Sequence, residues 1–204
     1  MTAMAQGAIT GFVLAGGKSS RMGADKAGLS LEGRTLLEHA LAAIRPVCEE
    51  VFIVGSRQIY GNAGPGYEDI YSGCGPLGGI HAALTHAQTD LNLIIAVDTP
   101  FLTMALLNHL AEKARQASAM IVTLRVGGYI EPLCSVYARS FLPVAEAALK
   151  AGNYKLAPLF PAHRTVVIEE AELSKFAFAA EMFENLNTPE DLERARRRAS
   201  GGKP

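Results

Sequence analysis

Short, largely apolar segments without regular polar alternation recur in the first half of this chain, with amphipathic segments between and after them. The apolar segments are residues 9–15, 51–54 and 91–97. A strand that is apolar on both sides must be covered on both faces, as in a parallel sheet between two layers of helices. Residues 35–44 and 103–116 have the helical spacing of apolar side chains that such layers require. We therefore predict an α/β fold with a mainly parallel sheet and helices on both faces.

The second half of the chain predicts that the sheet is mixed. Residues 120–124 and 130–137 have the character of strands, and the Gly127-Gly128 pair between them is typical of a hairpin turn. Because a hairpin joins antiparallel strands, its insertion makes a parallel sheet mixed. The other predicted elements are a helix at 140–151, strands at 165–168 and 182–186, and a final helix that is capped by Asn187 and has Pro189 in its first turn.

The length and charge of the chain limit its organisation and its partners. The 204 residues, of which 49% are hydrophobic, are enough for a core, and we predict a single domain over residues 1–204. The formal net charge of −1 and the pI of about 6.5 exclude general affinity for nucleic acid through a basic surface. Apolar runs stay far below the ~20 residues of a membrane-spanning helix, and the first ten residues lack a signal-peptide pattern. We expect no nucleic-acid and no membrane partner.

The cysteines and histidines form no recognisable metal or disulfide motif. Cys48, Cys74 and Cys134 are odd in number and include no CxxC pair, which favours a reducing, cytoplasmic compartment. The five histidines form no HExxH motif, and we expect them at the surface or half-buried.

The segment with the strongest chemical signal directly follows the first strand. Residues 14–26 read Leu-Ala-Gly-Gly-Lys-Ser-Ser-Arg-Met-Gly-Ala-Asp-Lys. The Gly16-Gly17 pair lets backbone N–H groups approach phosphate oxygens, and Arg21 and Lys26 add positive charge. Ligands of doubly wound sheets bind at the carboxyl ends of the strands. We predict a phosphate-binding loop here; the alternative is a flexible turn with unrelated cations.

Two better-known phosphate motifs do not fit this loop. A Walker A motif needs a glycine where the chain has Phe12, and the GxGxxG pattern of dehydrogenase-type dinucleotide folds is missing.

Asp98 follows the apolar segment 91–97 and begins an Asp-Thr-Pro sequence. An acidic side chain at the carboxyl end of such a strand is typical of a magnesium site, since this cation prefers oxygen ligands. The alternative is an N-cap for the following segment. Asn185 and Asn187 lie on one side of an extended segment, and the amide oxygen of Asn185 is a further candidate metal ligand.

A second glycine-rich segment, residues 75–81, opens a helix. Gly79 and its neighbours let a planar base lie against the backbone, and the alternative is a simple turn. Asp69 precedes this segment, after a short predicted strand. Its carboxylate can accept hydrogen bonds from both N1–H and the 2-amino group of guanine, although it can also be a cap.

These motifs together resemble those of the molybdenum cofactor guanylyltransferase family, within the MobA-like NTP transferases. The resemblance extends from about Thr10 to Arg196 and rests on LAGG-x-S-x-RMG-x-DK, the Asp-Thr-Pro sequence, GPLGG and the terminal N-x-NTPEDL. It implies a Rossmann-like nucleotidyltransferase fold, GTP and Mg²⁺ as ligands, and molybdopterin as the acceptor.

The resemblance also implies roles for individual residues. The nucleotide-binding residues by position are Leu14, Ala15, Gly16, Lys26, Asp69 and Asp98, and the two glycine-rich segments add Gly17 and Gly79 as candidates. Asp69 matches the nucleoside-contacting Asp of the family, and Asp98 matches its magnesium-binding Asp. The chain has Gly55 where some members have Asn after the second strand, so base recognition there must use the backbone or another residue.

The implied reaction transfers GMP from GTP to the terminal phosphate of Mo-molybdopterin and releases pyrophosphate. Arg21, Lys26 and Asp98 are its candidate catalytic residues, and the N-terminal part would bind GTP and Mg²⁺. The C-terminal part, including residues 152–155, would contribute the pterin site. Transient contacts with cofactor-synthesis proteins or apo-molybdoenzymes are also expected. The alternatives are a nucleotidyltransferase that uses CTP or another phosphate acceptor, a non-catalytic nucleotide-binding module and, more weakly, an NAD-linked oxidoreductase.

Overall fold

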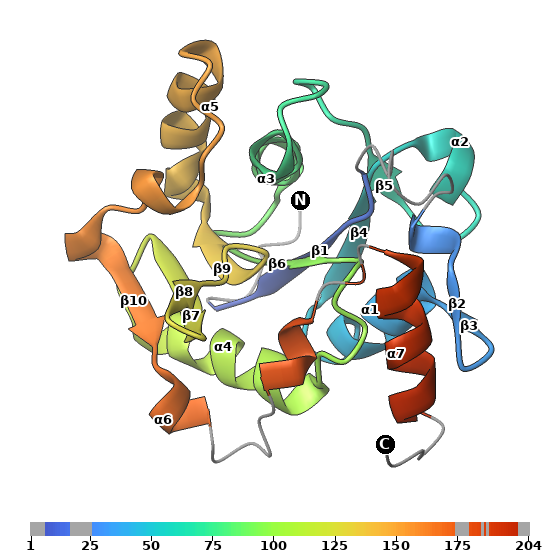
Figure 1. Cartoon of the computed structure of the whole chain (residues 1–204). Helices are drawn as coiled ribbons and strands as arrows, with labels where there is room; N and C mark the ends of the chain where they lie inside the picture. Colours follow the sequence, from blue (N-terminus) through green and yellow to red (C-terminus); the bar gives the residue numbers. More distant parts are fainter. Residues whose placement is uncertain (1–6, 17–25, 174–179, 185, 187, 200–204) are drawn as a thin grey trace.

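A mixed sheet forms the centre of the molecule in the computed structural model, which describes residues 7–16, 26–173, 180–184, 186 and 188–199 (Figure 1). Within these residues the sheet has eight strands, in the order β10-β7-β9-β6-β1-β4-β5 with β8 paired to β7. The strands are β1 (Ile9–Leu14), β4 (Glu50–Val54), β5 (Gly66–Tyr67), β6 (Leu91–Ala96), β7 (Ile121–Val126), β8 (Tyr129–Ile130), β9 (Cys134–Ala138) and β10 (Thr165–Ile168). A separate small hairpin joins β2 (Ser30–Leu31) to β3 (Arg34–Thr35).

The strand directions confirm the prediction of a mainly parallel, mixed sheet. Strand β1 pairs in parallel with β4 and β6, β4 with β5, and β7 with β10. Strand β9 is antiparallel to both β6 and β7. The carboxyl ends of β1, β4, β5 and β6 therefore meet at one edge of the sheet, together with the amino end of β9.

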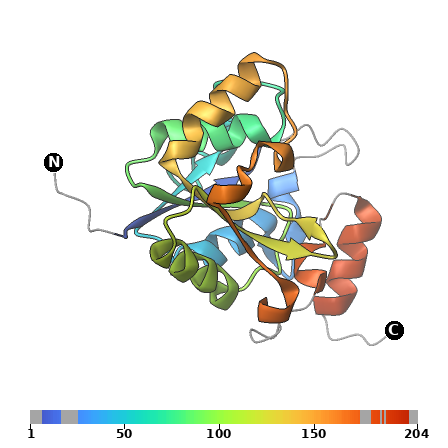
Figure 2. The ribbon, with the colours of Figure 1, turned by 90° about the vertical axis from the view of Figure 1, so that its left-hand side faces the viewer.

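Helices cover both faces of the sheet (Figures 1 and 2). Helices α3 (Pro76–His86) and α5 (Leu142–Lys150) lie on one face, and α1 (Leu36–Ile44), α4 (Met104–Gln116) and α7 (Pro189–Ala199) on the other. Within β1, Phe12 and Leu14 pack with the first layer, whereas Ile9 and Val13 pack with the second. Strands such as β1 are apolar at successive positions because each of their two sides faces a helical layer.

Short elements link these layers. They are α2 (Arg57–Tyr60), α6 (Glu170–Leu173) and the 3₁₀ turns η1 (Lys26–Gly28), η2 (Arg139–Phe141), η3 (Ala157–Leu159), η4 (Ala162–Arg164) and η6 (Ala180–Phe183). Thr35 and Glu38 form a capping box at the start of α1, and the Thr103 hydroxyl accepts from the Leu106 N–H at the start of α4. Within the described part of the chain, no helix combines the length and apolar character needed to cross a membrane.

The predicted hairpin is confirmed, but the strand predicted at 130–137 is interrupted. Gly127 and Gly128 both have positive φ and join β7 to β8, so they supply the turn conformation that glycine favours. Strand β8 ends at Ile130 and β9 begins at Cys134. Pro132 lies in the gap; it has no N–H to donate to a neighbouring strand, and the chain turns there.

The strand predicted at 182–186 is wrong. Residues 180–183 form the 3₁₀ turn η6 instead, and Phe183 and Leu186 are buried in the α1/α4 layer without strand pairing. A short apolar run can be buried in any backbone conformation, so its composition alone does not define a strand. The predicted cap Asn187 lies outside the described residues. The capping hydrogen bonds at the start of α7 are made by Thr188 and Asp191.

The expectation that the histidines lie at the surface or half-buried is wrong at His81. His81 is buried beneath the edge of the Tyr71 ring, and burial lowers its pKa. All three cysteines are free thiols, and burial raises the pKa of Cys48 to about 12.

Candidate functional site

Two predicted site residues, Lys26 and Asp98, meet at the carboxyl edge of the sheet. Asp98 lies just beyond the end of β6, and Lys26 begins η1, directly after the glycine-rich loop. The Lys26 Nζ and Asp98 Oδ2 atoms are 3.3 Å apart, and both side chains are about four-fifths buried, with exposed fractions of 19% and 20%. The predicted phosphate-binding cation thus lies next to the predicted metal-binding carboxylate.

The second carboxylate oxygen of Asp98 has no partner. Oδ1 is buried and accepts no hydrogen bond from any residue that the structure describes. Such an atom is costly to leave unsatisfied in a folded protein, and a metal ion would satisfy it. The capping alternative is not supported, because the turn after β6 is closed by the Thr99 hydroxyl, which donates to the Ala96 carbonyl at 3.1 Å. The described residues contain no group of three or more His, Cys, Asp or Glu side chains that could hold a metal.

Four other predicted residues come together beside Lys26 and Asp98, namely Leu14, Gly16, Asp69 and Gly79. A Cβ atom placed on Gly79 would lie 3.2 Å from Leu14 Cδ1 and 3.7 Å from Asp69 Oδ1, and one on Gly16 would lie 3.9 Å from Asp69 Oδ2. The Asp69 carboxylate is therefore close to the backbone of both glycines. Half-burial raises its pKa. Any larger residue at position 79 would crowd Leu14 and fill the space between α3 and the first strand.

The start of the loop is fixed by the neighbouring strand. The N–H groups of Ala15 and Gly16 both donate to the Val54 carbonyl, at 2.9 and 3.2 Å. The buried hydroxyl of Tyr60 donates to the Ala15 carbonyl at 3.0 Å. Three predicted residues, Gly17, Arg21 and Asn185, lie outside the described residues, so their roles remain predictions.

Comparison of the sequence with protein families identifies the family of this chain. A model of the MobA-like NTP transferase domain matches residues 11–166, about three-quarters of the chain and including Lys26, Asp69 and Asp98. The chain belongs to the MobA-like NTP transferase family.

Relatives of this chain match its sequence over most of their own length. The chain is 34% identical to a probable molybdenum cofactor guanylyltransferase of Carboxydothermus hydrogenoformans, over 91% of this chain and 94% of that one. It is 33% identical to the molybdenum cofactor guanylyltransferase of Desulfosudis oleivorans, over 96% and 98%.

Solved structures support the predicted nucleotidyltransferase fold. The molybdopterin-guanine dinucleotide biosynthesis protein A of Archaeoglobus fulgidus superposes with a TM-score of 0.81 at 28% identity, covering 94% of this chain and 99% of that one. The 2-C-methyl-D-erythritol 4-phosphate cytidylyltransferase of Thermus thermophilus shares the fold, with a TM-score of 0.66 at 20% identity, covering 93% and 98%.

Tyr60 explains why this MobA-like chain has glycine at position 55, and sequence reasoning missed it. A Cβ on Gly55 would lie 2.9 Å from Tyr60 Cε2 and 3.1 Å from the Gly16 nitrogen. The Tyr60 ring thus occupies the space that an Asn side chain would need, and it holds the Ala15 carbonyl instead. A single tyrosine in a four-residue helix carries no motif that could have revealed this role.

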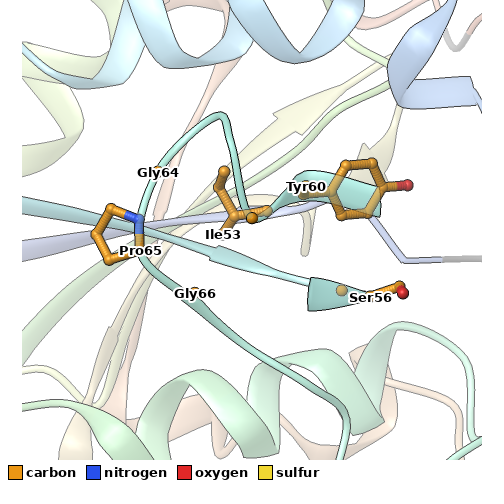
Figure 3. Close-up of a pocket in the computed structure, with 8 residues that line it drawn as sticks. Ile53, Ser56, Tyr60, Gly64, Pro65 and Gly66 are labelled. Atoms are coloured by element: carbon orange, nitrogen blue, oxygen red, sulfur yellow. The ribbon is translucent and has the colours of Figure 1, made fainter. Parts of the chain in front are cut away.

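A small pocket adjoins Tyr60, apart from the predicted nucleotide-binding carboxylates and Lys26 (Figure 3). It is lined by Ile53, Gly55, Ser56, Tyr60, Gly61, Gly64, Pro65 and Gly66. Its volume of about 170 Å³ is below the roughly 300 Å³ of the smallest ordinary ligand pockets. Its lining includes neither Lys26 nor the carboxylates of Asp69 and Asp98.

Gly55→Ala is expected to damage the loop that Tyr60 supports. The added methyl group must displace the Tyr60 ring or Gly16, at a cost of about 1–3 kcal/mol in the free energy of unfolding. Urea denaturation measures this cost, and we expect a raised KM for GTP in the same variant. Gly33→Ala is the comparison, because a Cβ there meets nothing within 4 Å although φ is also positive. An equal rise of KM in both variants would contradict the role of Tyr60.

Proposed function

We propose that this chain transfers GMP from GTP to molybdopterin that carries molybdenum, forming molybdopterin guanine dinucleotide and releasing pyrophosphate. The observation that carries the proposal is the meeting of Lys26 with Asp98, whose other oxygen is buried and unpartnered, beside the group formed by Leu14, Gly16, Asp69 and Gly79. The names of its relatives support guanylyl transfer.

The residues of the chain divide the work of binding. The backbone at Leu14, Ala15, Gly16 and Gly17 would approach the triphosphate, and Lys26 and Arg21 would neutralise its charge. Asp69 would accept from the guanine N1–H and 2-amino groups, with the base lying against Gly79. Asp98 would hold Mg²⁺, with Asn185 as a candidate further ligand. When bound, this ion neutralises charge on the α-phosphate and on the acceptor.

The chemical step needs little from the protein beyond positioning. An oxygen of the acceptor phosphate attacks the α-phosphorus, a new P–O bond forms, and the bond to the β-phosphate oxygen breaks as pyrophosphate leaves. The acceptor oxygen is already ionised at neutral pH, so no general base is required. When GTP binds, the Lys26 ammonium group must leave its ion pair with Asp98 and contact the phosphates of GTP instead. The Asp98 carboxylate is then available to the metal.

The proposal also covers where the pterin acceptor binds and where in the cell the protein works. Strand β9 is antiparallel to β6, so the following helix α5 runs back toward the carboxyl edge and brings residues 152–155 there. The side chain of Tyr154 in this segment interacts with that of Cys74, just ahead of α3. We therefore assign the pterin side to the C-terminal part of a single domain.

We also propose that the protein works in the cytoplasm, in transient contact with cofactor-synthesis proteins or apo-molybdoenzymes.

A nucleotide panel tests the proposal. With Mg²⁺ and Mo-molybdopterin, GTP should release pyrophosphate, and CTP, ATP and UTP should be poorer by about two orders of magnitude or more in kcat/KM, since mismatched bases leave buried polar groups unpaired. Equal turnover with CTP would disprove guanylyl specificity.

Inosine triphosphate isolates the contribution of Asp69, because hypoxanthine lacks the 2-amino group. We expect the wild type to bind GTP about tenfold or more tightly than inosine triphosphate, and Asp69→Asn to lose most of that preference. GTP affinity should also fall as the pH is lowered through the raised pKa of Asp69, since the protonated acid no longer accepts both hydrogen bonds. Calorimetric titration at several pH values measures both effects. An unchanged GTP preference in Asp69→Asn would remove Asp69 from base recognition.

A further inference from the structure

Glu131 is a half-buried carboxylate at the site edge that the proposed reaction does not use. It lies in the turn between β8 and β9, at the end of β9 that adjoins the carboxyl end of β6. The Ala96 N–H donates to the Leu133 carbonyl across these strands at 3.0 Å. Asp98 follows Ala96 by two residues, and Glu131 precedes Leu133 by two residues. The turn that holds Glu131 is therefore beside the turn that holds Asp98.

Along the carboxyl edge of the sheet, Glu131 and Asp69 lie on either side of Asp98. In the strand order β9-β6-β1-β4-β5, Asp69 follows β5, Asp98 follows β6, and Glu131 precedes β9. In a transfer reaction the phosphorus under attack lies between the donor nucleotide and the acceptor. If guanine binds on the β5 side and the phosphates at Asp98, the acceptor extends toward β9.

The backbone of Glu131 is held by buried hydroxyl groups. Its carbonyl accepts from Thr123 Oγ1 at 3.1 Å and from Ser135 Oγ at 2.7 Å, and both of these side chains are fully buried. Its N–H donates to the Leu124 carbonyl at 2.9 Å. Hydroxyl groups are costly to bury in an apolar core unless they are hydrogen-bonded, and here their bonds fix the position of one residue.

The carboxylate of Glu131, by contrast, is unengaged. Among the described residues it takes part in no hydrogen bond or ion pair, and burial raises its pKa. A carboxylate in such surroundings gains most from a ligand that offers two parallel N–H donors. The pyrimidine edge of a pterin offers this pair, N3–H and the 2-amino group, in the same arrangement that guanine presents to Asp69.

We propose that Glu131 binds the 2-amino-4-oxo edge of the pterin acceptor, as Asp69 binds the corresponding edge of guanine. The inference rests on the proposed function for the identity of the acceptor. It makes Glu131 a specificity-determining residue on the acceptor side, with a rigid backbone and a carboxylate that is satisfied only when the pterin is bound.

Two stable probes test this assignment on the whole protein. Pterin-6-carboxylate carries the edge in question, and lumazine-6-carboxylate replaces its 2-amino group by an oxo group. Fluorescence titration should give the wild type about tenfold or higher preference for the pterin, and Glu131→Gln should reduce that preference to near one. GTP affinity should stay unchanged, and the KM for Mo-molybdopterin should rise about tenfold or more. Glu112→Gln on α4, where Glu112 pairs with Arg115 at the surface, should behave as the wild type.

The outcomes separate this inference from the proposed function. A wild type that binds both probes equally, or a folded Glu131→Gln variant that keeps the pterin preference, would overturn the inference. If Glu131→Gln has a lowered melting temperature, Glu131→Asp keeps the charge but withdraws the carboxylate, and it should also lose the preference. Failure of the wild type to release pyrophosphate from GTP and Mo-molybdopterin would instead refute the proposed function, and the probe preference would stand without it.

Discussion

Asp98→Asn should leave the protein folded and abolish guanylyl transfer. The substitution keeps the shape of the side chain and removes the charge that would hold Mg²⁺, so we expect kcat to fall by about three orders of magnitude. The turn itself is held by other groups, namely the Thr99 hydroxyl and the Leu186 N–H, which donates to the Asp98 carbonyl at 3.1 Å. Loss of the mostly buried ion pair with Lys26 should cost about 1–3 kcal/mol in the free energy of unfolding, which a folded domain can tolerate.

Melting temperature and pyrophosphate release, measured on the same preparation, separate this role from a structural one. GTP binding without metal should be unchanged or slightly stronger in Asp98→Asn, because a negative charge near the phosphates is gone and Lys26 is released. A stability loss with near-normal turnover would contradict the metal site and leave only a nucleotide-binding fold.

Lys26→Ala should lower kcat/KM for GTP by about two orders of magnitude or more. The variant loses a charge-assisted contact to phosphate in a shielded position. The matched control is Lys150→Ala on α5, since Lys150 is exposed and pairs with Glu146 on the surface of the same helix. Comparable losses in the two variants would show that general charge, and not the position of Lys26, matters.

The same variant also reveals whether Lys26 and the metal compete for Asp98. Without nucleotide, Lys26→Ala should bind a divalent cation more tightly than the wild type, because the ion pair at 3.3 Å no longer occupies the carboxylate. Mn²⁺, which takes the same oxygen ligands as Mg²⁺, can be titrated and followed by its EPR signal. Unchanged Mn²⁺ affinity would mean that the resting ion pair does not control access to the metal site.

Local patterns in the sequence were sufficient for most of the elements and for the motifs. Strands β1, β4 and β6 were predicted from short apolar runs, and helices α1 and α4 from apolar residues at helical spacing. The spacing of apolar residues along such a short segment is enough to predict whether one or two of its sides are buried. The glycine-rich loop, Asp69 and Asp98 could be predicted as site residues because the chemistry of phosphate, guanine and magnesium restricts which residue types can serve at strand ends. Local reasoning failed at residues 182–186, where burial did not require strand geometry.

Contacts between distant segments were decided only by the tertiary structure. The ion pair of Lys26 with Asp98 joins residues 72 positions apart, and the hydrogen bond from Tyr60 to Ala15 joins residues 45 apart. Short segments of the sequence do not predict that the Tyr60 ring fills the space beside Gly55. They also do not predict that Glu131 lies beside Asp98. Both depend on the order in which strands pair, and that order is set by the simultaneous burial of both sheet faces, a property of the whole chain. The sequence thus indicated which residues are candidates for the chemistry, and the strand order determined which of these candidates meet.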